Sequence, residues 1–298
     1  MRIFVTGATG FIGSAIVQEL IGAGHQVLGL ARSDASAQSL AVAGAEVHRG
    51  TLEDLDSLRR GAIGSDGVIH TAFIHDFSNM AAAGKTDLHA IEALGAALEG
   101  SGRPLVVTSG IGLLAPGRLG TEADAADPKS AGGHRVASEA ATLSLETRGV
   151  RASLVRLPPS VHGVGDHGFV PFLIAIAREK GVSAYVEEGL NRWPAVHRLD
   201  AARLFRLAME KGLAGSRFHG VADGGVPTRD IAAAIGRHLN LPVVAKSRED
   251  APGHFGWLAH FFGMDCPASS VWTQEQLGWH PTQPGLVADL DGEHYFQL

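Results

Sequence analysis

Three glycines near the start of the chain have the spacing of a phosphate-binding turn. Gly7, Gly10 and Gly13 follow a short apolar run and open an apolar-periodic segment, which predicts strand, tight turn and helix over residues 2–22. Gly7 permits the turn, Gly10 leaves the backbone open to a ligand, and Gly13 lets the helix pack closely on a sheet. Because a helix N-terminus presents free N–H groups and a positive dipole end, we expect this turn to bind the diphosphate of a dinucleotide.

The elements that must position this turn alternate between strand and helix. Because the chain contains 39 glycines, an ordinary glycine-rich turn is the alternative interpretation, but a second strand at 25–31 favours a nucleotide site. Helices are expected at 36–43, 52–60, 87–98 and 134–147, and strands at 46–48, 68–72, 104–109 and 151–157. Such alternation predicts a parallel sheet with helices on both faces, an α/β doubly wound sheet of the Rossmann type.

Ligands of such a sheet bind beyond the carboxyl ends of its strands, so the turns after Val5, Leu30, Ala72, Ser109 and Leu157 are the expected site. Beyond Pro158 the loops lengthen and aromatic residues cluster. We expect a nucleotide-binding domain over 1–160 and a smaller, mostly substrate-binding lobe over 161–298, with strand and helix returning to the first domain at about 191–222. The aromatics of the lobe are expected to form its core and could also wall a substrate pocket.

Composition excludes several functions. With 298 residues, 45% hydrophobic and 19% charged, the chain fits a globular protein, and its formal net charge of −6 gives no basic field for nucleic acid or anionic membrane. The apolar run at 169–177 is too short to span a bilayer. Only one cysteine, Cys266, is present, and the 15 histidines show no metal-ligand spacing, so we expect no disulfide, no metal and a cytoplasmic location.

With these motifs the chain resembles the extended branch of the short-chain dehydrogenase/reductase superfamily. Residues 6–13, Thr-Gly-Ala-Thr-Gly-Phe-Ile-Gly, match its TGxxGxxG signature. The likeness covers nearly the whole chain and includes the segments at 50–54, 68–72, 106–109, 155–163, 193–202 and 277–281. The resemblance implies a Rossmann fold and nucleotide-dependent redox chemistry.

The sequence departs from that family at its catalytic dyad. The family uses Tyr-x-x-x-Lys, in which the lysine lowers the pKa of the tyrosine that exchanges the substrate proton. Neither Tyr185 nor Tyr295 precedes a lysine by four residues. Matching Glu139 to the family places Ala131 at the tyrosine position and Arg135 at the lysine position. The chain therefore resembles an atypical member of the family, in which Arg135 could still hold the nicotinamide ribose but cannot exchange a proton; a plain surface arginine is the alternative.

Ser109 ends the fifth strand, where the resemblance implies a serine that polarises the substrate oxygen. The family presents a second hydroxyl residue next, and here Gly110 stands in that place. Ser109 is thus a catalytic candidate, with a simple turn serine as the alternative.

The end of the second strand indicates which nucleotide binds. NAD-preferring relatives carry an acidic residue there, whereas this chain has Arg32 and Ser33, which suit a 2′-phosphate. We therefore predict NADP(H), with a solvated loop charge as the alternative for Arg32. The resemblance also places Thr51 and Leu52 against adenine. The expected cofactor-binding residues are Thr6, Gly7, Gly10, Phe11, Ile12, Gly13, Arg32, Ser33, Thr51, Leu52, Thr71, Ala72, Arg135 and Pro158.

A histidine is the most economical replacement for the missing tyrosine, since its ordinary pKa lies near neutrality. His75 follows the fourth strand beside the expected nicotinamide pocket and is the first candidate. His162, where relatives often have tyrosine, is second, and His134 is third. For each, a hydrogen-bonded loop histidine is the alternative. His197 is expected to be structural.

We therefore predict an NADP(H)-dependent oxidoreductase that reduces a small or medium apolar carbonyl, imine or activated alkene by hydride transfer. The alternatives are a non-catalytic NADP(H)-binding redox sensor and an enzyme like the sugar-nucleotide epimerases and dehydratases. The amphipathic helices at 87–98 and 134–147 could pair across a homodimer.

Overall fold

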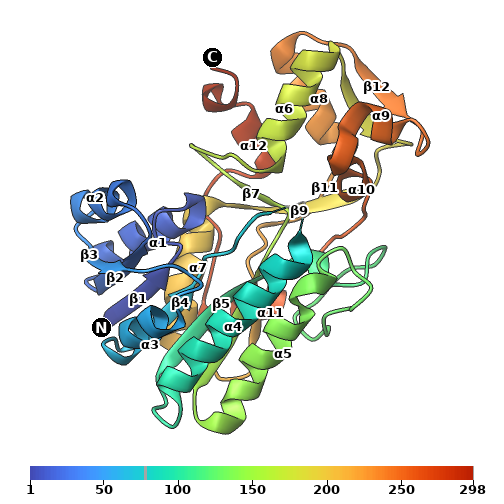
Figure 1. Ribbon diagram of the computed structural model, residues 1–298. Helices are drawn as coiled ribbons and strands as arrows, with labels where there is room; N and C mark the ends of the chain where they lie inside the picture. The colour runs from blue at the N-terminus through green and yellow to red at the C-terminus, as the bar shows by residue number, and fades with distance from the viewer. Residues whose placement is uncertain (77–78, 298) are drawn as a thin grey trace.

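The computed structural model describes residues 1–76 and 79–297 and centres on a parallel seven-stranded sheet of order β10-β6-β5-β4-β1-β2-β3 (Figure 1). Its strands are β1 (Arg2–Thr6), β2 (Gln26–Ala31), β3 (Glu46–Arg49), β4 (Gly67–His70), β5 (Pro104–Gly110), β6 (Arg151–Leu157) and β10 (Arg217–His219). The predicted doubly wound Rossmann sheet is confirmed. Because all neighbours in the sheet run parallel, the carboxyl ends of β1, β4 and β5 meet at one edge.

Helices cover both faces of this sheet. The core on one face combines Ile3 and Val5 with α1 (Phe11–Gly22), α2 (Asp34–Val42) and α7 (Arg198–Lys211). Phe4, which points the opposite way, packs with α3 (Leu55–Ile63) and α4 (Met80–Leu98). In Figure 1, α4 and α5 (Val136–Ser144) lie in front of the sheet and α7 lies behind it. Pairing of α4 and α5 across a dimer stays a prediction.

Most of the remaining elements gather above the carboxyl edge of the sheet, whereas α11 (Val271–Leu277) packs against α7 and β10 (Figure 1). The three-stranded sheet β11-β9-β7 combines β7 (Ser160–His162), β9 (Arg192–His197) and β11 (Asp223–Pro227), and a two-stranded sheet pairs β8 (Ser183–Val186) with β12 (Val243–Lys246). The helices are α6 (Phe169–Lys180), α8 (Thr228–Leu239), α9 (Ala251–Phe255), α10 (Ala259–Phe262), α11 (Val271–Leu277) and α12 (Leu286–Leu290). Many aromatics of the lobe form its core, in which Trp193 is fully buried against Phe262.

Three predicted helix boundaries are wrong. α4 begins at Met80, seven residues earlier than expected, because the Asn79 side chain caps it by accepting from the Ala82 N–H. α3 begins at Leu55, since Asp54 accepts from the Ser57 N–H. The helix expected over 134–147 is α-helical only at Val136–Ser144, with 3₁₀ turns on either side.

Among residues 1–76 and 79–297, no helix combines the length and apolar character needed to cross a bilayer. In the same part of the chain, no group of three or more His, Cys, Asp or Glu side chains is arranged to hold a metal ion.

Candidate active site

The glycine turn between β1 and α1 is built for close backbone approach. Gly7 has φ 68°, and a Cβ there would lie 2.7 Å from the Ala72 nitrogen. A Cβ on Gly13 would lie 2.0 Å from the Gly7 oxygen, so the helix could not start where it does. The first turn of α1 carries no acidic residue and its N–H groups have no partner within the helix. This cradle fits the diphosphate of a dinucleotide.

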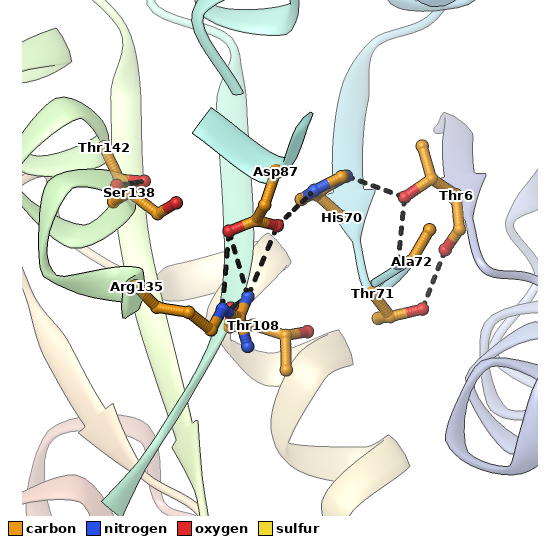
Figure 2. A network of polar contacts seen from close by, with 9 residues as sticks. All are labelled: Thr6, His70, Thr71, Ala72, Asp87, Thr108, Arg135, Ser138 and Thr142. Carbon is orange, nitrogen blue, oxygen red and sulfur yellow. Dashed lines mark hydrogen bonds and ion pairs between the residues drawn. The ribbon is translucent and has the colours of Figure 1, made fainter. Parts of the chain in front are cut away.

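A network of buried polar contacts extends from this turn across the ends of β4 and β5 (Figure 2). The Thr6 hydroxyl lies 2.8 Å from His70 Nδ1 and also accepts from the Ala72 N–H. On its other side, His70 Nε2 lies 3.2 Å from Asp87 Oδ1, and both side chains are buried. The Thr71 hydroxyl donates to the Thr6 carbonyl at 2.7 Å. These contacts fix the strand ends around the turn.

Asp87 connects this network of polar contacts to Arg135. Arg135 Nη2 lies 3.3 Å from Asp87 Oδ2 and donates to the Thr108 carbonyl at 2.7 Å (Figure 2). Burial of Asp87 would by itself raise the pKa of its carboxyl group, but the Arg135 charge and the His70 hydrogen bond lower that pKa to about 2. The carboxylate is therefore ionised at neutral pH. Arg135 is thus held at the end of β5 rather than on the outer surface of a helix.

The Phe73 ring contacts Arg135 and two of the candidate proton-donor histidines. The Arg135 guanidinium stacks on the Phe73 ring with 4.4 Å between Cζ and the ring centroid. The His75 and His134 ring centroids lie 5.2 Å and 6.0 Å from that of Phe73. The surrounding protein and the nearby Arg135 charge lower the pKa of both histidines, although much of His75 is accessible to solvent. Both rings are therefore mostly neutral at pH 7.

Ser109 is placed differently from this group. It is buried, and its hydroxyl donates to Glu139 Oε1 at 2.6 Å. Glu139 also receives two hydrogen bonds from Arg156, at 2.9 and 2.7 Å. The Ser109 hydroxyl hydrogen is thus used to anchor α5 to β5, and a catalytic role for it stays a prediction.

His162 is also away from the Phe73 group. It is fully buried at the end of β7, with Nδ1 2.7 Å from Asp289 Oδ2, and its ring packs edge-on against His197. His197 accepts from the Leu199 N–H and thereby caps α7, as expected of a structural residue. The proposed catalytic function of His162 remains a prediction.

The two tyrosines lie in the lobe. The Tyr295 hydroxyl donates to Asp166 at 2.8 Å and accepts from the Gly163 N–H at 3.1 Å. Burial and the Asp166 charge raise the pKa of Tyr295 well above its ordinary value. Tyr185 lies on β8.

The expected adenosine end of the site lies at the ends of β2 and β3. Arg32 is exposed there, whereas the Ser33 hydroxyl accepts from the Ser36 N–H and so caps α2. Arg49, beside Ala31 in the sheet register, forms an ion pair with Asp34. Thr51 is exposed and Leu52 half-buried just after β3, while Pro158 is buried after β6.

Sequence reasoning missed Asp87, His70 and Phe73. A signal was available for His70, which ends a buried apolar strand beside the glycine turn. Asp87 is 48 positions from Arg135 in the sequence, and its role follows only from the tertiary packing of α4 on the segment before α5.

Comparisons with known proteins agree with this architecture. Residues 3–219 match the model of the NAD dependent epimerase/dehydratase family. The uncharacterized protein C2A9.02 of Schizosaccharomyces pombe is 53% identical over 99% of this chain and 100% of its own. A ketoreductase of Stigmatella aurantiaca, named for 4-hydroxy-2-methyl-3-oxo-4-farnesyl-3,4-dihydroquinoline-1-oxide, is 28% identical over 87% of this chain and 81% of its own.

A solved structure is similar over nearly the whole fold. DesIV, a dTDP-glucose 4,6-dehydratase from Streptomyces venezuelae crystallised with NAD and TYD, aligns with TM-score 0.78 and 20% identity over 98% of this chain and 95% of its own. The sheet, the glycine turn and the family match together define a nucleotide-binding protein of the extended short-chain dehydrogenase/reductase type. The chain belongs to the NAD dependent epimerase/dehydratase family, whose members are oxidoreductases or epimerases that use NAD or NADP.

Proposed function

We propose that this protein is an NADP(H)-dependent oxidoreductase that reduces a small or medium apolar carbonyl, imine or activated alkene. The observation that carries the proposal is the position of Arg135, held between Asp87 and the Thr108 carbonyl at the end of β5, with two histidines around the adjoining Phe73. A fixed guanidinium suits the hydroxyls of a nicotinamide ribose, and the histidines are proton-transfer groups. The nicotinamide, when bound, supplies the hydride.

His75 is the proton donor in this proposal. It is solvent-accessible and can be reprotonated from water, whereas Ser109 and His162 are buried. Arg135 orients the nucleotide, and burial together with the Arg135 charge keeps the pKa of His75 below the ordinary value. A lowered pKa makes the protonated ring a stronger acid toward the developing alkoxide or amine, and it restricts that protonated form to lower pH.

The preference for NADP(H) rests on Arg32. Its exposed side chain at the end of β2 can turn toward a 2′-phosphate. Ser33 contributes less than its position suggests, because its hydroxyl already caps α2.

The substrate class rests on the lobe and on one relative. Phe172 and Trp257 pack edge-on and keep 45% and 46% of their surface exposed, which provides an apolar wall outside the aromatic core. The name of the Stigmatella aurantiaca relative describes reduction of a ketone. An apolar carbonyl compound fits both observations.

The test is oxidation of NADPH against a panel of apolar ketones, aldehydes, imines and activated alkenes, with NADH in parallel. We expect turnover with members of the panel and faster turnover with NADPH. Tight NADPH binding without turnover of any compound would overturn the enzyme proposal in favour of a redox sensor, a candidate supported by the internal bond of the Ser109 hydroxyl. Conversion of a sugar nucleotide without net oxidation of the cofactor would instead establish an epimerase or dehydratase.

A further inference from the structure

Arg198, the first residue of α7, reaches across to the glycine turn. Its Nη2 donates to the Ser14 hydroxyl at 3.0 Å, and its Cζ lies 4.7 Å above the centroid of the Phe11 ring. Phe11 and Ser14 form the first turn of α1. The guanidinium is therefore placed at the helix end whose free N–H groups we assign to a dinucleotide diphosphate.

The two helices that meet here run in the same direction. Arg198 contacts Ser14. Arg206, which is further toward the C-terminus of α7, forms an ion pair with Glu19 of α1 at 2.7 Å. The earlier residue of α1 contacts the earlier residue of α7, and the later residue contacts the later one. The two helices are therefore parallel, and their N-termini lie at the same end. The positive ends of two helix dipoles and one guanidinium therefore converge on the glycine turn.

This concentration of positive charge has no counter-charge in the described part of the chain. No ion pair there includes Arg198, and its buried Nε has no hydrogen-bond partner. The nearby carboxylates are used elsewhere: Asp200 accepts from the N–H groups at 282 and 283, and Asp166 accepts from the Tyr295 hydroxyl. A guanidinium beside the positive end of a helix is unfavourable unless an anion lies between them.

Arg198 also contacts the loop that leads from β7 to α6. Its Nη1 donates to the Val164 carbonyl at 2.8 Å, and His167 of this loop packs edge-on against Phe11 with 5.6 Å between centroids. A Cβ on Gly163, whose φ is 128°, would lie 3.1 Å from Arg198 Cγ. The loop thus packs on the guanidinium and the glycine turn together.

From this geometry we propose that Arg198 is an additional ligand of the dinucleotide diphosphate, and that it joins the bound diphosphate to the loop at 163–168. The inference rests on the proposed function only for the presence of a dinucleotide. It assigns the diphosphate a charged partner from outside the β1–α1 turn, and this partner also contacts the loop. The guanidinium donates N–H groups to the phosphate oxygens, a charge-assisted contact.

The test compares Arg198→Ala, Arg198→Lys and the parent protein for binding of NADPH, NADH, ADP-ribose and adenosine by calorimetry. Arg198→Ala should raise the dissociation constants of the three diphosphate compounds by a similar factor, about tenfold or more, because one charge-assisted contact is lost from each. Adenosine, which lacks both phosphates, should bind unchanged. Arg198→Lys keeps the charge and loses the planar fork, so its dissociation constants should lie in between.

Arg203→Ala is the matched control, since Arg203 lies on the same helix and should leave all four constants unchanged. Circular dichroism and thermal melting verify that each variant is folded. If Arg198→Ala does not fold, an unchanged NADPH constant in Arg198→Lys would overturn the inference. Equal constants in parent and Arg198→Ala, or an equal loss for adenosine, would also overturn it.

Because the readout is binding, the result is independent of turnover. A parent protein that binds NADPH but reduces no compound would contradict the proposed enzyme while leaving the role of Arg198 intact. A parent protein that binds no dinucleotide would overturn both.

Discussion

Arg135 and Asp87, 48 positions apart in the chain, form an ion pair with 3.3 Å between Nη2 and Oδ2. Asp87 is 1% exposed, and its second oxygen contacts His70, which contacts Thr6 at the glycine turn. The Arg135 charge at the end of β5 is therefore positioned through side chains that reach the glycine turn.

Asp87→Asn should weaken this positioning. Because an amide cannot balance the guanidinium, we expect a loss of about 3 kcal/mol in the free energy of unfolding and about a tenfold higher KM for the nucleotide. Urea denaturation and initial-rate kinetics measure both. Glu92→Gln on the exposed side of α4 is the control and should change neither value.

The acid stability of the protein should also depend on Asp87. Its folded-state pKa of about 2 is below the ordinary value of 3.8, so its contribution is present above about pH 4 and is lost as the pH falls toward 2. Between pH 5 and pH 2 the parent should lose about 2 kcal/mol more stability than Asp87→Asn. Parallel stability curves for the two proteins would contradict the ionised, buried carboxylate.

His75→Gln should lower the rate of reduction by about a hundredfold or more if His75 donates the proton. A donor must be protonated, and the pKa of His75 is lowered, so kcat of the parent should fall as the pH rises through a value below 6.5. The profile of the variant should lack this step. His134→Gln is the comparison, and a loss confined to that variant would transfer the role to His134.

Arg32→Ala should raise the dissociation constant of NADPH by about tenfold and leave that of NADH unchanged, because only the 2′-phosphate is lost as a partner. Fluorescence titration of both nucleotides measures the difference. Arg59→Ala, which removes an exposed guanidinium paired with Asp56, is the control. Equal affinities of the parent for NADPH and NADH would disprove the preference.

Gly13→Ala and Gly22→Ala are two substitutions in the same helix, α1, and together they test the close contact between this helix and the glycine turn. The new methyl group at position 13 would lie 2.0 Å from the Gly7 oxygen, whereas at position 22 it would meet nothing within 4 Å. We expect Gly13→Ala to lose at least about 2 kcal/mol of stability and nucleotide binding, and Gly22→Ala to gain about 0.5–1 kcal/mol. A folded Gly13→Ala variant that binds NADPH normally would contradict the close-packed turn.

The local parts of the fold were predictable from the sequence, since short-range patterns encode them. The three glycines define the turn, and β6 spans Arg151–Leu157 as its apolar pattern predicts. The family motif indicated Arg135 as a cofactor ligand, and that role stays a prediction. Its partner Asp87 could not be predicted, because nothing near Asp87 in the sequence indicates which distant side chain it meets.

Buried polar partners also limit what a motif reveals about chemistry. Ser109 stands at the end of a strand in the pattern of a catalytic serine, yet its hydroxyl bonds to Glu139, whose charge is balanced by Arg156. His162 likewise pairs with Asp289, 127 residues further along the chain. A sequence cannot distinguish such a histidine from one that faces a ligand, since both follow a buried strand.

The strand order of the main sheet has a consequence for biosynthesis. β10 covers the outer edge of β6, but residues 158–216 lie between the two strands. A ribosome therefore completes β6 well before its outer partner exists, and the unpaired N–H and C=O groups of that edge form a template for other chains. During this part of translation the nascent protein carries an open sheet edge of the kind that chaperones shield from aggregation.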